Sequence, residues 1–137
     1  MSDRHEYRDA ITVQRVENLA VGAALLVGAI AVGGPWWIVL AAFLLFDLSA
    51  LGYLAGPRWG AWSYNLVHNY TAPAVLGVIF VALEAGGRDI AWLSWLAAAW
   101  GFHVAVDRAL GYGLKLATFT ETHLGRIGRP GESGSSG

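Results

Sequence analysis

The fold is decided by an almost uninterrupted apolar stretch, WWIVLAAFLLFDLSALGYL, at residues 36–54. At about 1.5 Å per helical residue, a stretch of this length crosses a bilayer core of about 30 Å. Its one charged side chain, Asp47, lies inside the apolar run. The stretch therefore predicts a transmembrane helix, and an ionisable residue within such a helix is a candidate functional group.

The composition of the whole chain indicates a membrane protein. Of its 137 residues 55% are hydrophobic and only 14% are charged, far from the usual balance of a soluble domain. A formal net charge of −1 argues against a nucleic-acid partner, and the absence of cysteine excludes disulfides and thiolate metal ligands. Any chemistry must use side chains such as His, Asp and Glu.

Three further apolar stretches resemble the first, at about residues 10–32, 60–83 and 90–113. Glycine, proline and tryptophan mark their boundaries, and the short connections favour antiparallel neighbours. The sequence thus predicts an all-α fold, an integral membrane up-and-down bundle of four transmembrane helices, as a single domain over residues 1–129. Residues 130–137 have the composition of an appended flexible linker.

Lysine and arginine are distributed unevenly between the two sides of the predicted bundle. One side carries eight of them, whereas the other carries Arg88 alone. The positive-inside rule therefore places both termini and the second connection in the cytoplasm. The eight are Arg4, Arg8, Arg15, Arg58, Arg108, Lys115, Arg126 and Arg129.

Ionisable residues occur in all four predicted spans. Counted from the centre of each span, the five at Glu17, Asp47, His68, His103 and Asp107 lie within about 8 Å of the midplane, all displaced toward the cytoplasm. His103 and Asp107 are four residues apart and share a helix face. We expect these side chains to meet in one layer.

Such a layer has several interpretations. Asp47, His68, His103 and Asp107 suit a divalent metal such as zinc, which would make them the catalytic residues of a hydrolytic site, supported by Glu17, Tyr64, Asn65 and Arg108. Without metal they would form an acid/base pair, bind a lipid or small apolar ligand, or serve as a structural hydrogen-bond network. The sequence leaves open whether the protein is an enzyme and whether it forms a homo-oligomer.

The segments outside the spans have weaker signals. Tyr53 and Tyr112 suit interfacial anchors. The tail after residue 118 has too few apolar residues to span a membrane, so we expect it to lie on the membrane surface or to fold beneath the bundle. In the second case His123 becomes a candidate to join the polar layer from below.

Four strings together resemble the family of the domain of unknown function numbered 4260, small bacterial four-span membrane proteins. The resemblance covers nearly the whole chain to Arg129, implies a bacterial inner-membrane protein and carries no known activity. The strings are DLSALGYLAGPR from Asp47, YNLVH from Tyr64, DRALGYGLK from Asp107 and THLGRIG from Thr122.

A looser similarity relates the chain to bacterial inner-membrane metal-dependent hydrolases. Their pattern places an aspartate at the end of an early helix, a histidine on the next helix and a His-x-x-x-Asp on a later one. Asp47, His68, His103 and Asp107 follow this order, although a second aspartate after Asp47 and a Thr-His-Ser triplet around His68 are missing. The similarity implies hydrolysis as the first enzymatic hypothesis.

Overall fold

The structure, a computed structural model, describes residues 2–31, 33–116 and 120–127. The linker predicted at residues 130–137 lies outside this part of the chain. Helix dominates, as predicted, and three helical stretches are long and apolar enough to cross a membrane, His5–Ala31, Trp36–Ala55 and Pro57–Ala85. The elements are α1 (Ser2–Ala31), α2 (Trp36–Ala41), α3 (Phe43–Asp47), the 3₁₀ helix η1 (Leu48–Ala55), α4 (Pro57–Val67), α5 (Thr71–Ala85), α6 (Ala91–Leu110), β1 (Glu121–Thr122) and β2 (Gly125–Arg126).

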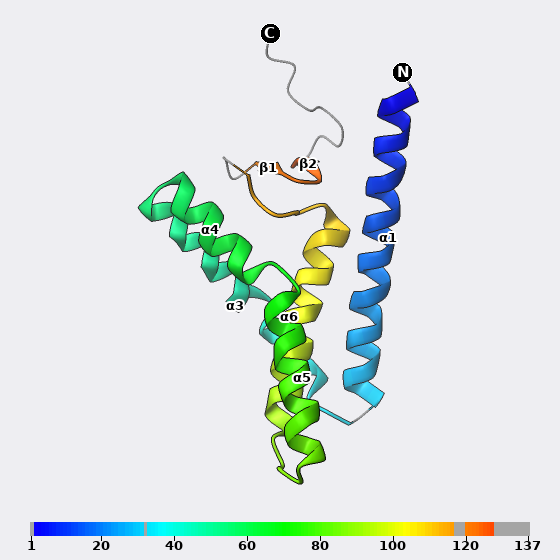
Figure 1. Ribbon diagram of the computed structural model, residues 1–137, viewed down its shortest axis with the longest axis vertical. Helices are drawn as coiled ribbons and strands as arrows, with labels where there is room; N and C mark the ends of the chain where they lie inside the picture. The colour runs from blue at the N-terminus through cyan, green and yellow to red at the C-terminus, as the bar shows by residue number, and fades with distance from the viewer. Residues whose placement is uncertain (1, 32, 117–119, 128–137) are drawn as a thin grey trace.

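Helix α6 is the element around which the others pack. It contacts α1, α5, α2 and α3, whereas η1 packs mainly against α4. Figure 1 shows α5 alongside α6, and the η1–α4 pair diverging from both. The start of α1, the η1–α4 connection and the β1–β2 hairpin lie at one end of the molecule, and the α1–α2 and α5–α6 connections lie at the other.

The stretch predicted as one helix over residues 60–83 is broken in the structure between α4 and α5. Pro73 has no backbone N–H to donate to the carbonyl of Asn69, and the Asn69 side-chain oxygen instead accepts from the N–H of Thr71 at 2.8 Å. The indole of Trp100 donates to the carbonyl of Val67 at 2.7 Å, which satisfies an acceptor that the break exposes. The break sets the direction of the His68 side chain.

The second predicted span is helical apart from a turn at Ala42 between α2 and α3, and it tightens to a 3₁₀ helix after Asp47. Two glycines allow the close approach of η1 to α4. A Cβ on Gly52 would overlap the side chain of Ser63, and one on Gly60 would overlap the ring of Tyr53. Ser63 Oγ also donates to the carbonyl of Ser49 at 2.8 Å. These contacts make η1 and α4 one packed unit.

The tail after α6 folds back toward α4, as one of the two sequence expectations stated. Gly111 ends α6 in the left-handed conformation, with φ of +96°. The side chain of Asn65 then brackets Lys115, donating to its carbonyl at 2.8 Å and accepting from its N–H at 2.7 Å. Lys115 also pairs with Thr122 of the two-stranded β1–β2 hairpin. The all-α prediction did not include this hairpin, whose two-residue strands are too short for a sequence period.

A large apolar groove runs between α1, α5 and α6. Its volume is about 760 Å³, and its walls include Leu25 of α1, Pro73 and Gly77 of α5 and Ala98 and Gly101 of α6. The groove is deep along α6 because the residues of α6 that line it, such as Ala98 and Gly101, have small side chains or none. None of the four predicted metal ligands lines it.

Replacing Gly60 with alanine tests the packing of η1 on α4. The new methyl group would overlap the root of the Tyr53 ring rather than a flexible chain end, so we expect a loss of stability of about 1–3 kcal/mol, read as a lower melting temperature in detergent. Gly77→Ala is the matched control, because nothing lies within 4 Å of its added Cβ. Equal melting temperatures for the two variants would contradict this packing.

Candidate metal centre

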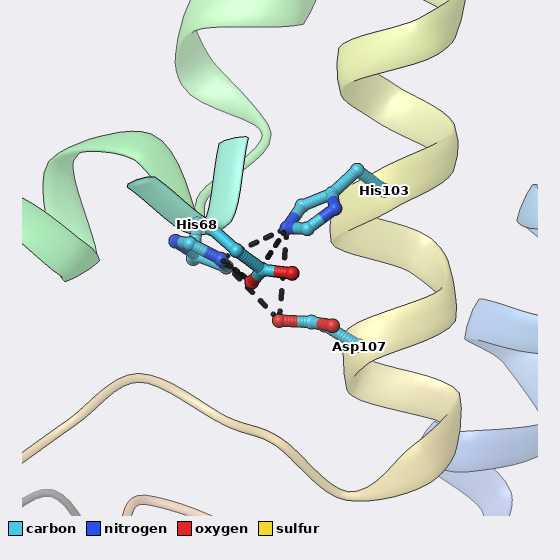
Figure 2. A group of neighbouring side chains, drawn as sticks. His68, His103 and Asp107 are labelled. Atoms are coloured by element: carbon cyan, nitrogen blue, oxygen red, sulfur yellow. Dashed lines mark hydrogen bonds and ion pairs between the residues drawn. The ribbon is translucent and has the colours of Figure 1, made fainter. Parts of the chain in front are cut away.

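Four side chains from three parts of the fold meet beside α6. Asp47 is the last residue of α3, and His68 follows the last residue of α4. His103 and Asp107 lie one turn apart on α6. Each side chain offers one ligand atom, and these four atoms all lie within 4.8 Å of one another. Figure 2 shows the side chains pointing toward a common centre.

The distances between the converging atoms are short. Nε2 of His103 lies 2.9 Å from Nε2 of His68. Oδ2 of Asp107 lies 3.4 Å from Nε2 of His68 and 3.8 Å from Nε2 of His103. Oδ1 of Asp47 lies 3.5 Å and 3.7 Å from the same two nitrogens.

Three members of the cluster are buried and one is open. His68, His103 and Asp107 are 3%, 0% and 7% exposed, whereas the side chain of Asp47 is 44% exposed. The rings of Phe43 and Phe46 lie 4.6 and 5.4 Å from the ring of His103 and cover its side of the cluster. Access to the cluster is therefore on the side of Asp47.

Tyr64 holds both His68 and Asp107. Its hydroxyl donates to Oδ2 of Asp107 at 2.9 Å, and its backbone carbonyl lies 2.9 Å from Nδ1 of His68. The two rings stack at 3.6 Å with an interplanar angle of 7°. Because a carbonyl can only accept, Nδ1 of His68 carries the proton and its Nε2 presents a bare lone pair to the centre.

Hydrogen bonds alone leave this arrangement poorly satisfied. The carboxylate oxygens are acceptors, and so is Nε2 of His68 in the tautomer that Tyr64 selects. A neutral His103 can supply one proton from Nε2, which leaves its Nδ1 without one, and that buried Nδ1 has no hydrogen-bond partner among the described residues. Two protonated imidazoles would bring two N–H groups together across 2.9 Å. The cluster thus gathers more lone pairs than protons.

A divalent cation at the centre would take up the lone pairs of both Nε2 atoms and of both carboxylates, with the proton of His103 then on its Nδ1. Tetrahedral zinc with bonds of about 2.0–2.1 Å holds its ligand atoms about 3.3 Å apart. The five separations that involve a histidine nitrogen, 2.9–3.8 Å, bracket that value, and all four ligand atoms lie within 4.8 Å of one another. The contact from Nδ1 of His68 to the Tyr64 carbonyl is also the support that metal-bound histidines usually have. The residues present therefore fit a metal ion.

The four supporting residues predicted from sequence differ in how close they lie to the cluster. Tyr64 contacts the cluster, and Asn65 acts one step away by bracketing Lys115. Glu17 is exposed on α1, and its predicted approach to the layer is wrong. The guanidinium of Arg108 lies over the ring of Tyr70, 5.5 Å from its centre.

Two polar residues near the cluster were not predicted. Ser49 Oγ lies 3.4 Å from Nδ1 of His68, and Lys115 is 3% exposed with its Nζ 4.7 Å from the ring centre of Tyr64. A buried lysine in a tail segment has no periodicity to reveal it. The one sequence signal was the string DRALGYGLK, which begins at Asp107 and ends at Lys115.

His123 fastens the tail instead of joining the cluster. Its Nδ1 accepts from the N–H of Leu114 at 2.8 Å, and its Nε2 lies 3.5 Å from a guanidinium nitrogen of Arg108. Partial burial and the charge of Arg108 lower the pKa of His123 below its usual 6.5. The neutral imidazole is therefore the form that docks the tail.

One family model matches most of the chain. It is the model of the Domain of unknown function (DUF4260), and it matches residues 11–127. The chain belongs to this family. All four cluster residues of this DUF4260 member, together with Tyr64 and Lys115, fall inside the matched region. No curated protein and no solved structure matches the chain.

Removing the Tyr64 hydroxyl tests its role as a positioning group. Tyr64→Phe retains the ring that stacks on His68 but leaves Oδ2 of Asp107 without its donor, so we expect metal affinity to fall by about 10- to 100-fold, measured by competition with a chelating dye. Tyr7→Phe, at an exposed position of α1, is the control. Unchanged affinity in Tyr64→Phe would show that the hydroxyl does not orient Asp107.

Acidification should undock the tail. Because the folded pKa of His123 is lowered, docking is complete above the unfolded value of 6.5 and is lost as the pH falls below it. The amide resonance of Leu114, followed by NMR from about pH 7.5 to about pH 5, should move toward its unbonded position. In His123→Gln, which accepts without titrating, the resonance should stay constant, and a transition retained in that variant would assign the effect to another group.

Proposed function

We propose that this protein is a metal-dependent membrane hydrolase whose centre is formed by Asp47, His68, His103 and Asp107. The observation that supports it best is the convergence of four ligand atoms within 4.8 Å of one another. A bound divalent metal supplies Lewis acidity and brings the deprotonation of a bound water close to neutral pH. The protein would supply the ligands, an accessible coordination position and a route for the substrate.

The burial pattern favours a reactive centre over a purely structural one. Structural zinc sites are closed, whereas catalytic sites combine about three protein ligands with an accessible position. His68, His103 and Asp107 are the three buried members, and Asp47 stands on the open side with its side chain 44% exposed. Asp47 is thus the member that gives way to water or substrate and that can accept a proton from it.

The location of the centre favours a substrate that is associated with the membrane. Asp47 and His68 belong to two of the stretches that are long and apolar enough to cross a membrane. The segment after α6 is bound beside the cluster, because Asn65 donates to the carbonyl of Lys115 while the neighbouring Tyr64 donates to Asp107. A substrate anchored in the bilayer reaches this depth without leaving the lipid.

We further infer that α6 is a fourth span. Its 20 residues are about 30 Å long, sufficient for a bilayer core, although His103, Asp107 and Arg108 make it less apolar than the other three stretches. Packing among α1, α2, α3 and α5 supports this, because those neighbours bury its polar groups. The chain up to residue 129 then forms one four-span domain.

The distribution of cations supports an orientation. Arg8 and Arg15 lie in the first half of α1, Arg58 in the first turn of α4 and Lys115 in the segment that leads to the hairpin, whereas Arg88 lies in the α5–α6 connection. The start of α1, the η1–α4 connection and the hairpin share one end of the molecule, and the α5–α6 connection lies at the other (Figure 1). The positive-inside rule then places the hairpin end and both termini in the cytoplasm. Together with the resemblance to bacterial four-span proteins, this favours the bacterial inner membrane.

A non-enzymatic bundle that binds a lipid is the second candidate. The groove of about 760 Å³ between α1, α5 and α6 favours it, because its apolar walls suit an acyl chain. In this alternative the His/Asp cluster only fixes the helix packing. The two candidates differ in whether the cluster holds a metal.

The metal content of purified protein decides between them. We expect about one divalent ion per chain by elemental analysis, and its loss in His103→Ala, which removes a fully buried ligand. His5→Ala, which removes an exposed histidine of α1, should retain the ion. Metal-free wild-type protein whose melting temperature is unchanged by added zinc would overturn the proposed function.

A further inference from the structure

The apolar groove between α1, α5 and α6 lies apart from the proposed metal centre. Its floor on α6 includes Gly101, which precedes His103 by two residues and is therefore turned about 200° away from it around the helix axis. None of the four clustered residues lines the groove. What fills the groove is thus a separate question from whether the cluster holds a metal.

The length of the groove suits one hydrocarbon chain. On the α5 side its lining residues extend from Tyr70, directly before the helix, to Ala82, which is about 18 Å at 1.5 Å per residue. One leaflet of a bilayer has a hydrocarbon depth of about 15 Å, half of the whole core. The groove is therefore about as long as one acyl chain of a lipid in a single leaflet.

Protein side chains leave the groove unfilled. Helices α1 and α5 both pack on α6, and in the described part of the chain they make little contact with each other. On α5, nothing lies within 4 Å of a Cβ added to Gly77, one of the lining residues. A volume of about 760 Å³ without occupant would forfeit the dispersion contacts of the atoms around it.

One end of the groove is polar on all three of its sides. There the hydroxyl of Tyr70 donates to Oδ1 of Asn18 on α1. On α6, Arg108 follows Gly101 by two turns on the same face, and its guanidinium lies 5.5 Å from the centre of the Tyr70 ring. Because α6 ends two residues after Arg108, this end of the groove reaches the depth of the lipid head groups in the four-span arrangement.

The guanidinium of Arg108 has donors to spare for an anion. It carries five N–H donors. Within the described residues one of its nitrogens lies 3.5 Å from Nε2 of His123, its Nε has no hydrogen-bond partner, and no carboxylate forms an ion pair with it. A second guanidinium lies nearby, since Nε of Arg15 donates to the carbonyl of Ala109 at 2.7 Å. This end of the groove therefore offers the positive charge and the paired donors that bind phosphate.

We propose that the groove binds one anionic phospholipid, with an acyl chain between α1 and α5 and the phosphate at Arg108. Apolar walls alone would suit any acyl chain or a helix of a second copy, whereas a cation at one end favours a lipid of net negative charge over a zwitterionic one. The inference goes beyond the proposed function, because this lipid lies on the face of α6 that points away from the cluster and is not the substrate.

Native mass spectrometry of the detergent-purified protein tests the head-group preference. When phosphatidylglycerol and phosphatidylcholine with the same acyl chains are added, we expect one tightly bound lipid per chain and about a fivefold preference for phosphatidylglycerol, as one cation near an anionic head group provides. In Arg108→Gln one lipid should still bind, but without the preference. Arg88→Gln, at an exposed position in the α5–α6 connection, is the matched control and should behave as wild type.

A variant that fills the groove tests the position of the acyl chain. Gly77→Leu adds a side chain where there is open space, so it should leave the helix packing intact and weaken the binding of both lipids about tenfold or more, the effect of displacing about two buried methylene groups. Gly28→Leu is its control, because the added Cβ also meets nothing within 4 Å and Gly28 does not line the groove.

Each measurement has a result that would overturn the inference. A preference for phosphatidylglycerol that survives in Arg108→Gln would remove the arginine from the site, and unchanged lipid affinity in Gly77→Leu would place the lipid elsewhere. A wild-type dimer that becomes a monomer in Gly77→Leu, with lipid binding unchanged, would show that a second copy fills the groove. Since Gly77→Leu leaves Arg108 in place, it decides the matter even where Arg108→Gln fails to fold.

Discussion

The structure depends on the meeting of two carboxylates and two imidazoles in a largely buried place. Asp47 ends α3, His68 directly follows α4 and the His103–Asp107 pair lies on α6, and each of these groups would be costly if it faced lipid alone. Once together, they present lone pairs to one another across 2.9–3.8 Å with too few protons to share. In the proposed function a bound cation makes this convergence favourable, so folding and metal binding are coupled.

The surrounding elements can be understood as ways of holding these four groups. The break before Pro73 ends α4 at the residue where His68 must turn toward α6, and Trp100 bonds the Val67 carbonyl beside that break. Gly52 and Gly60 let η1 lie close against α4, which keeps Asp47 and Tyr64 in the same region. Departures from regular helix therefore occur where the cluster needs them, as is common at functional sites.

Sequence reasoning predicted the helical class, the four clustered residues and the Tyr64 contact, because apolar length, depth and i, i+4 spacing are local properties. It failed where the outcome depends on contacts between distant segments. Glu17 had the right depth, but it lies on the exposed side of α1, and helix rotation could not be derived from one charged residue. The break at His68 was readable in principle from Asn69 and Pro73. The bracket from Asn65 to Lys115 joins residues fifty positions apart and had no sequence signal.

The segment after α6 links His123 to the four clustered residues through Lys115 and Tyr64. Lys115 reaches Tyr64 only while the segment after Gly111 is folded back, and His123 fastens that segment through the N–H of Leu114. A change that releases His123 would also withdraw a positive charge from behind Tyr64, without touching a metal ligand. Such a release would leave the four clustered residues in place, because Asp47, His103 and Asp107 belong to α3 and α6 and His68 directly follows α4, whereas Lys115 lies outside those helices.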